Sequence, residues 1–522
     1  MEYWLSRITI ALVLMAGCVV AILAASWAVE GAYTWLAGLL VFCGLMTAFA
    51  VLNTNFWLII PFALNMPGAF NFLPIPFSFL ELSIVLVATQ FFLNRVVLEK
   101  RGISLGPPAL VIPLVAFGLL VGYHWLIGGT GLRIFGGDTF GARRNFAIAL
   151  AVLAYFIVSN MNVRGNAYLR AIPAFYLAGV FLGTAPYFFT SVFPSTAPYV
   201  NYFLGNVNVE AYTEFQSDMI IAPDADLGRV GQLVALGNAL LLCLVAYFPV
   251  RDWWRPARWW VLGLALAGLF LVLRGGFRSA LFHYLVIGGT AAWLSLRWKS
   301  VLPAMMGGLT IMVLAQLHGN LIHLPLSVQR TISFMPGNWD YTVMRGVESS
   351  NDFRQQIQHT YLREGFWESP WIGNGFKVDR REIEQAVQQG IEFHGQMDPI
   401  RGFIARKDFH VGWISLYDCG GVVGCVFFAW MVGAMCWLFY KRRWALEDPK
   451  FAPLYTWLLC LFAKEILGYF VVFGAIHSSM TILTVMAGFL VAMGDRPGSE
   501  GDAPVGESAA TRQRTSRELV PA

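Results

Sequence analysis

Long apolar segments recur along this chain from one end to the other, and they constrain its fold more than any other feature. A run of about 17 to 25 mostly apolar residues crosses the hydrocarbon core of a bilayer as an α-helix. Only 13% of the 522 residues are charged, whereas a soluble domain usually has about 25%. The sequence also lacks the alternating segments of roughly ten residues that form outer-membrane barrels. It therefore predicts an all-α, polytopic bundle of transmembrane helices.

Polar breaks divide the apolar part into about twelve to fourteen predicted helices. The segment 55–66 is short and interrupted by polar and helix-breaking residues, so it either spans the bilayer or re-enters it. We predict a membrane domain over residues 1–494 and a disordered cytoplasmic tail over 495–522, which is polar and rich in Gly, Pro and Ser. The predicted spans are 8–28, 33–52, 55–66, 77–96, 108–128, 144–160, 167–190, 230–249, 257–273, 279–296, 301–317, 411–440, 452–475 and 477–493.

The positions of Lys and Arg predict the orientation of the bundle, because cytoplasmic loops carry an excess of both. These residues gather in alternate loops, which we place in the cytoplasm with both termini: Arg95, Lys100, Arg101, Arg164, Arg251, Arg255, Arg258, Arg297, Lys299, Lys441, Arg442 and Arg443. Two long segments, about 191–228 and 318–410, are then external. The second contains amphipathic helical patterns around Asp352–Arg363 and Arg380–Gln389. Loops of this length are usually functional or disordered, and we expect this one to be partly helical and to cover a site.

Several classes of function do not fit the composition. The net charge of +5 suits loops that face anionic lipid and does not indicate nucleic-acid binding. All seven cysteines lie in or at the edge of apolar spans, which argues against a disulfide scaffold or a zinc cage. No HExxH or GxSxG motif and no metal-spaced acidic pair occurs in an external loop. We therefore expect chemistry that uses neither a metal nor a cofactor.

Two arginines stand on the side of the membrane that cations usually avoid. Arg229 and Arg278 each open a predicted helix at its external end. A helix N-terminus carries unpaired N–H groups and the positive end of the helix dipole. A guanidinium beside it forms a site for an anion such as phosphate. Arginines at helix ends also reach lipid headgroups without binding a ligand, and this alternative stays open.

His410 stands where the long loop re-enters an apolar helix, just after Arg406, Lys407 and Asp408. Histidine is the side chain whose unperturbed pKa lies nearest 7, so it is a candidate to take a proton from a sugar hydroxyl. A lone histidine at a membrane interface is also often structural. The sequence does not decide between the two roles.

Four other charged residues fall within or near the ends of apolar spans: Glu81, Asp418, Lys464 and Glu465. Intramembrane charges are candidate functional residues by default. Adjacent residues on a helix point in different directions, so we expect Glu465 to pair with a basic group and to brace the bundle. If these charges instead lined a path, the chain would be a secondary transporter or a flippase for lipid-linked oligosaccharides. A structural component of an envelope complex is a third possibility.

Four motifs follow one another between Arg229 and Gly424. They are Arg229 with Gly231 and Asn238; RGGFRS at Arg274–Ser279; a long loop with VQRTISFMP at Val328–Pro336, Arg354 and the predicted tight turn ESPWIGNGF at Glu368–Phe376; and His410 followed by LYDCGGVVG. In this order they resemble the O-antigen ligase / O-antigen polymerase superfamily of bacterial envelope glycosyltransferases. Many members have asparagine directly after the histidine, where this chain has Val411.

The resemblance implies an inverting glycosyltransferase of the bacterial inner membrane that acts on the periplasmic face. Its donor would be a glycan linked to a polyprenyl diphosphate such as undecaprenyl diphosphate, whose prenyl tail would enter from the membrane lipid. Its acceptor would be a sugar hydroxyl on a glycan or on lipid A core. Ligation, polymerisation and protein glycosylation all stay open.

The resemblance also implies roles for individual residues. Arg229 and Arg278 would hold the diphosphate and stabilise the charge of the leaving group. His410 would position or deprotonate the acceptor hydroxyl. Three further arginines are weaker candidates for contacts with the donor or the loop: Arg274, Arg330 and Arg354.

Overall fold

The computed structural model of the chain describes residues 55–66, 68–70, 77–92, 103–128, 139–161, 163–193, 195, 230–379, 381, 383–385, 399–409, 411–472 and 474–495. The predicted spans 8–28 and 33–52, most of the first long loop and the predicted tail lie outside these residues.

Seven helical segments in the described part of the chain are long and apolar enough to cross a membrane. They are α5 (Pro108–Gly128), α6 (Ala142–Ser159), α7 (Ile172–Val192) with the turn before it, α11 (Trp259–Arg274) with the turn before it, α12 (Arg278–Leu296) with the turn after it, α18 (Gly412–Lys441) and α19 (Ala452–Val471). Four shorter apolar helices accompany them: α4 (Phe79–Phe91), α10 (Gly231–Tyr247), α13 (Val301–Leu317) and α20 (Ile476–Ala492). The chain is therefore a multi-pass membrane protein with an all-α polytopic fold, as the apolar segments predict.

The ambiguous segment 55–66 folds as two short pieces. A 3-10 turn, η1 (Phe56–Leu58), leads into α3 (Ile59–Ala63), which is too short to cross a bilayer. Gly68 follows with φ +117, and the two-residue strands β1 (Ala69–Phe70) and β2 (Phe77–Ser78) pair antiparallel before α4 begins.

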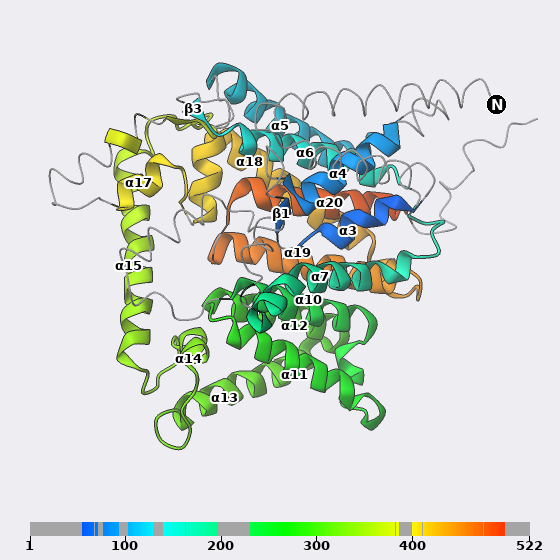
Figure 1. The fold of residues 1–522 in the computed structure, drawn as a ribbon. Helices are drawn as coiled ribbons and strands as arrows, with labels where there is room; N and C mark the ends of the chain where they lie inside the picture. Colours follow the sequence, from blue (N-terminus) through cyan, green and yellow to red (C-terminus); the bar gives the residue numbers. More distant parts are fainter. Residues whose placement is uncertain are drawn as a thin grey trace, which may run out of the picture.

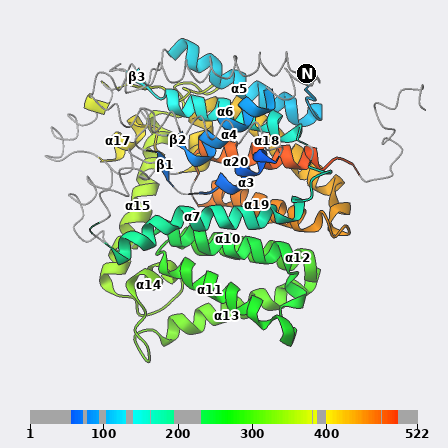
Figure 2. The ribbon, with the colours of Figure 1, turned by 45° about the vertical axis from the view of Figure 1, so that its right-hand side comes forward.

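Most of the membrane helices lie alongside one another, and α15 (Tyr341–Glu364) runs across their ends (Figures 1 and 2). We call this end of the bundle, where α12, α18 and α20 begin, the loop end. Two short helices, α14 (Leu326–Ile332) and α17 (Pro399–Ala405), lie at the loop end with α15. The strand β4 (Val378–Asp379) ties the loop to β3 (Thr139–Phe140), which precedes α6, in an antiparallel pair.

The helix α15 confirms the first amphipathic pattern of the long loop. It is longer than predicted, and it buries Val343, Val347, Ile357 and Tyr361. These side chains are spaced by four, ten and four residues, which places them on one face of a helix with 3.6 residues per turn. The second pattern, Arg380–Gln389, lies largely outside the described residues.

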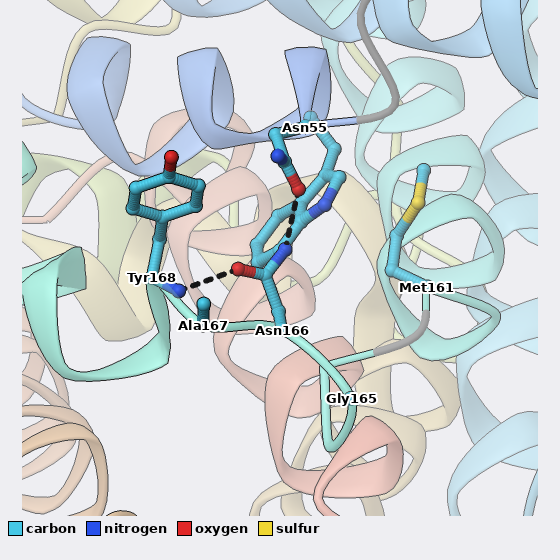
Figure 3. Close-up of a pocket in the computed structure, with 7 residues that line it drawn as sticks. Asn55, Met161, Gly165, Asn166, Ala167 and Tyr168 are labelled. Carbon is cyan, nitrogen blue, oxygen red and sulfur yellow. Dashed lines mark hydrogen bonds between the residues drawn. The ribbon is translucent and has the colours of Figure 1, made fainter.

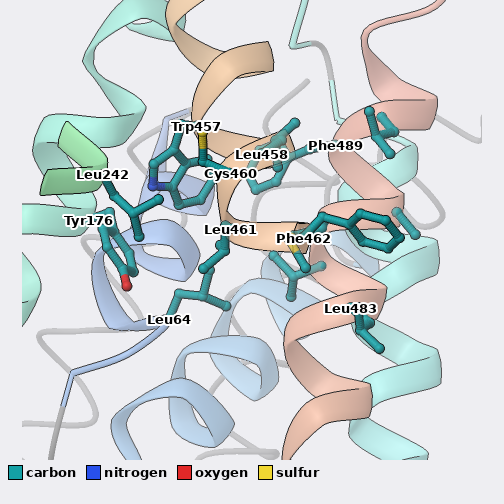
Figure 4. Close-up of a cluster of buried hydrophobic side chains, with 14 of the residues drawn as sticks. Leu64, Tyr176, Leu242, Trp457, Leu458, Cys460, Leu461, Phe462, Leu483 and Phe489 are labelled. Carbon is teal, nitrogen blue, oxygen red and sulfur yellow. The ribbon is translucent and has the colours of Figure 1, made fainter. Parts of the chain in front are cut away.

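The helix α19 runs through the centre of the hydrophobic core (Figure 4). Its Trp457, Leu458 and Leu461 are each fully buried. Trp457 packs edge-on against Tyr176 of α7, with ring centroids 5.4 Å apart. Trp57 and Phe489 extend the core toward η1 and α20, with ring centroids 6.0 Å apart.

The intramembrane charges of α19 pair with each other. Lys464 Nζ lies 2.6 Å from Glu465 Oε1. The expectation that Glu465 pairs with a basic group is confirmed. The expectation that neighbouring side chains point apart is wrong here, because the long lysine chain bends back to its neighbour. Pairing the two opposite charges offsets the free-energy cost of placing either ion alone in the membrane.

Close backbone contact between α10 and α11 generates a testable prediction. A Cβ atom added to Gly237 would meet Gly268 O at 2.5 Å and Val272 Cγ2 at 2.8 Å. Small residues at helix contacts in membranes allow this approach. We expect Gly237→Ala to lower the free energy of unfolding by about 1–3 kcal/mol, because the helices must separate. Thermal unfolding in detergent measures this.

Gly263, on α11, is the matched control for Gly237. A Cβ there meets no atom of the described chain within 4 Å. Gly263→Ala should leave the unfolding temperature unchanged or raise it slightly, because alanine favours helix. Equal losses in both variants would contradict the proposed contact.

Candidate functional site

A sharp turn between α11 and α12 carries the first group of predicted arginines. Arg274 ends α11 and is exposed, and Arg278 begins α12, as predicted. Between them Gly276 adopts φ +73, a left-handed conformation that glycine adopts without strain. Val230, just before α10, donates its N–H to Gly275 O at 3.1 Å. The starts of α10 and α12 therefore meet at one point of the loop end.

Arg278 reaches from this turn to the crossing helix α15. Its Nη2 donates to Asn351 Oδ1 at 3.0 Å. Arg354 lies one helical turn after Asn351, and its positive charge acts on Arg278. Burial lowers the pKa of Arg354 below its ordinary value. Among the described residues, neither arginine forms an ion pair with a carboxylate, so two repelling cations are held together.

Arg330 belongs to the same region. It lies on α14, which contacts α11, α12 and α15, and Thr331 beside it donates to Leu273 O at 3.2 Å. Arg330 is only 5% exposed, yet no carboxylate of the described chain pairs with it. Asp340, at the start of α15, accepts a hydrogen bond from Gln329 instead, at 2.5 Å. A buried cation without a partner is costly, and a bound anion would remove that cost.

The second part of the site is a break in a membrane helix. Gly421, within α18, has φ +59 and ψ −158, which no α-helix contains. The segment Pro370–Gly375 of the long loop fills the break. Asn374 and Gly375 donate N–H groups to Asp418 O and Cys419 O, at 2.6 and 3.2 Å, respectively. Val422 and Val423 in turn donate to Pro370 O and Trp371 O, at 2.9 and 3.0 Å.

The inserted segment needs its glycines. Gly373 has φ +74 and Gly375 has φ +63, and a Cβ at Gly373 would lie 2.6 Å from Asp418 O. The prediction of a tight turn with close backbone approach is therefore confirmed. Gly421 lies roughly 13 Å along the helix axis from Gly412, at 1.5 Å per residue. The loop thus reaches into the membrane span itself.

A buried ion pair fastens this insertion to the segment before His410. Lys407 Nζ lies 3.0 Å from Asp418 Oδ2, with the two side chains 14% and 6% exposed. Lys407 Nζ also donates to Gly375 O at 3.1 Å. Asp418 Oδ1 accepts from Asn374 Nδ2 at 3.1 Å and from the Tyr361 hydroxyl at 3.3 Å. Burial, with Asp418 beside it, raises the pKa of Tyr361, so the phenol stays a donor.

The backbone of this segment is held from the other side as well. Arg144, in the first turn of α6, donates from Nη1 to Arg406 O at 3.0 Å and to Lys407 O at 3.3 Å. Lys407 itself adopts φ +58, which is rare for a residue with a side chain. Such a conformation persists only where the surroundings hold it in place.

His410 and Arg229 lie outside the described residues. The residue before His410, Phe409, is 3% exposed and packs edge-on against Tyr361 of α15, with ring centroids 4.9 Å apart. Val411, after it, packs against the same small cluster, which includes Ile357. Ile357 is one helical turn beyond Arg354 on α15. Phe409 therefore lies against the helix that carries Arg354, and Val411 packs on the cluster that this helix shares with α17 and α18.

Sequence reasoning did not find several residues of this region. Asn351 was detectable as a polar residue one turn before Arg354 on an amphipathic helix. Lys407 and Asp418 each stand out in the sequence as charged residues near an apolar span. No local sequence pattern indicates that they form an ion pair. The partners of Asp418 on the inserted segment and α15 depend on the break in α18.

A cavity of about 330 Å³ lies beside η1, between the end of α6 and the start of α7 (Figure 3). Its described lining is Asn55, Trp57, Met161, Gly165, Asn166, Ala167 and Tyr168. Asn166 Nδ2 donates to Asn55 Oδ1 at 2.7 Å. None of these lining side chains is charged, so this cavity lacks the chemistry of a diphosphate site.

No protein-family model matches this chain, and no curated protein is similar to it. The assignment of a functional site to the arginines at the loop end and to the inserted segment therefore rests on their geometry alone.

The buried ion pair yields a prediction for stability. Lys407→Met strands the Asp418 carboxylate in a buried site, so we expect the free energy of unfolding to fall by about 3–5 kcal/mol. The double variant Lys407→Met with Asp418→Asn should recover part of this loss, because no charge is then left alone. Thermal or denaturant unfolding of the purified protein measures both.

Arg401 provides the control, since it forms an exposed pair with Glu364 at 3.4 Å. An exposed pair contributes about 0–1 kcal/mol, so Arg401→Met should have little effect. A loss for Lys407→Met no larger than that for Arg401→Met would show that the buried pair does not hold the loop.

Proposed function

We propose that this protein is a membrane glycosyltransferase that moves a glycan from a polyprenyl-diphosphate donor to a sugar hydroxyl. The observation that carries the proposal is the set of arginines at the loop end. Arg278, Arg330 and Arg354 lie on three helices that meet there, and no carboxylate of the described chain neutralises them. A diphosphate supplies the negative charge and the acceptor oxygens that these guanidinium groups lack.

The site fits a lipid-linked donor in particular. The arginines stand where α10 and α12 begin, so the headgroup of a membrane lipid could meet them while its chain stays in the bilayer. The donor would be of the undecaprenyl-diphosphate type. The resemblance to the O-antigen ligase / O-antigen polymerase superfamily supports the same donor class. We place the loop end in the periplasm, with the protein in the bacterial inner membrane, following the distribution of Lys and Arg.

In the proposed reaction, the acceptor hydroxyl oxygen attacks the anomeric carbon of the donor sugar. The bond from that carbon to the diphosphate oxygen breaks, and the electron pair leaves with the diphosphate. Arg278 and Arg354, with Arg229 and Arg330, stabilise the charge that develops there. His410 takes the proton of the hydroxyl. One displacement of this kind inverts the anomeric centre.

The frame around His410 supports its proposed role. The Lys407–Asp418 pair and Arg144 hold the segment just before it, and Phe409 packs on α15. A general base must be held at a fixed distance from the hydroxyl that it serves. The inserted segment, the ion pair and α15 together provide such a rigid support.

The arginines give a direct test of catalysis. In vesicles supplied with a polyprenyl-diphosphate glycan and an acceptor sugar, Arg278→Gln and Arg354→Gln should each lower the transfer rate about 100-fold or more. Radiolabelled glycan on the acceptor measures the rate. Arg345 is exposed on the same helix as Arg354, so Arg345→Gln is the matched control and should change the rate by less than about twofold.

The same assay separates transfer from transport. A transporter or flippase would need no acceptor and would depend on the Lys464–Glu465 pair instead. If Arg278→Gln and Arg354→Gln transferred glycan normally while Lys464→Met abolished glycan movement, the enzyme proposal would fail and transport would take its place.

The orientation is testable by labelling. A cysteine at Asp352, exposed on α15, should react with a membrane-impermeant maleimide added to intact spheroplasts. A cysteine at Trp298, 79% exposed in the turn at the other end of α12, should react only after the membrane is opened. The reverse pattern would place the loop end in the cytoplasm, away from a periplasmic acceptor.

A further inference from the structure

The end of the bundle opposite the loop end contains a buried cation that has no partner among the described residues. Arg442 follows the last residue of α18 and is only 6% exposed. Its Nε and Nη1 atoms are buried and make no hydrogen bond to any residue that the structure describes. No ion pair joins it to any carboxylate within the described part of the chain. Native proteins seldom leave such donors unmatched, so the group calls for an explanation.

The surroundings of Arg442 do not neutralise it. Burial lowers its pKa to about 10, and the nearby charge of Arg164 acts in the same direction. Asp495 acts in the opposite direction, but its carboxylate is held by Lys441 at 3.0 Å. The negative end of the α18 dipole offsets part of the cost. A positive charge is nevertheless buried with two idle donors.

A third unpaired donor lies close along the chain. Trp444, two residues after Arg442 in the turn η9 (Arg443–Leu446), has a buried Nε1 that makes no hydrogen bond within the described part of the chain. The group that is missing here must therefore accept hydrogen bonds, and it must be negative to balance Arg442. Phosphate has both properties and binds a planar guanidinium through two oxygens.

The aromatic residues nearby indicate the depth of this region in the membrane. Trp437 and Tyr440, in the last two turns of α18, are 60% and 58% exposed on the bundle surface. Trp and Tyr in such positions concentrate at the headgroup level. Arg443 lies over the Tyr440 ring, 4.8 Å from its centroid, so its guanidinium makes its contact outside the buried site. Arg442 is thus buried at the depth of lipid phosphates.

We propose that Arg442 is the centre of a phosphate-binding site at this end of the bundle, separate from the arginines of the loop end. Its ligand is the phosphate of an anionic membrane lipid or free inorganic phosphate. Arg442 pairs with the phosphate oxygens, and Trp444 donates its indole N–H to the same group. The site needs no glycosyl transfer, so it stands whether or not the proposed function does.

Lipid retention tests the site. The purified protein is stripped of lipid, incubated with phosphatidylglycerol or phosphatidylcholine, and weighed by native mass spectrometry. Wild-type protein and Arg443→Gln should retain phosphatidylglycerol about threefold or more above Arg442→Gln, and phosphatidylcholine should bind all three alike. Arg443 is the matched control, because it is the adjacent arginine and its guanidinium stacks outside.

Free phosphate forms the second arm. Inorganic phosphate at about 20 mM should raise the unfolding temperature of wild-type protein above that in chloride of equal ionic strength, but not that of Arg442→Gln, if free phosphate is the ligand. Retained phosphatidylglycerol without this shift identifies the lipid as the source. Arg442→Lys, which keeps the charge without the planar fork, should fall between wild type and Arg442→Gln and serves if the glutamine variant does not fold.

The proposal is overturned if wild-type protein shows neither preferential retention of phosphatidylglycerol nor a phosphate-dependent shift. It is also overturned if the Arg442 variants that fold retain phosphatidylglycerol, and respond to phosphate, as wild-type protein does. Loss of either response in Arg443→Gln but not in Arg442→Gln would place the phosphate on the outer arginine and equally reject the buried site.

Discussion

Backbone groups inside a bilayer must be satisfied by the protein, because hydrocarbon offers them no partner. The helical conformation of α18 is interrupted at Gly421, and a segment of the long loop supplies hydrogen-bond partners there. Carbonyls at Asp418 and Cys419 and N–H groups at Val422 and Val423 all bond to the segment Pro370–Gly375. The rest of the loop end depends on this inserted segment. The helix α15 lies on one side of the segment, and the residues before His410 lie on the other.

The cationic side chains of the described residues fall into two groups, those that pair with a carboxylate and those that do not. Lys407 and Lys464 are each matched by a carboxylate at 3.0 and 2.6 Å. Arg278, Arg330 and Arg354 lie at the loop end without a carboxylate partner among the residues that the structure describes. Matched pairs brace the fold, whereas unmatched cations raise its energy until an anion binds. The difference separates the residues that support the loop end from those that we propose to bind the donor.

The lengths of the apolar segments predicted the all-α polytopic fold, because helix length in a membrane is set by bilayer thickness and is local in sequence. Local sequence patterns likewise predicted that Arg278 begins a helix and that an amphipathic helix surrounds Arg354. They could not predict that Pro370–Gly375 enters α18, because those hydrogen bonds join residues 44 to 52 positions apart. Nor could they show that Lys464 folds back on Glu465, which depends on side-chain conformation and not on helix geometry.

The inserted segment also limits how the chain can vary and move. The turn between α14 and α15 can tolerate added length, since Pro336, Gly337 and Asn338 are exposed. Between Ser369 and Phe376, one extra residue would shift the register of every hydrogen bond with α18 and leave donors facing lipid. The hydrogen bonds between Pro370–Gly375 and α18 therefore fix this part of the loop against the helix.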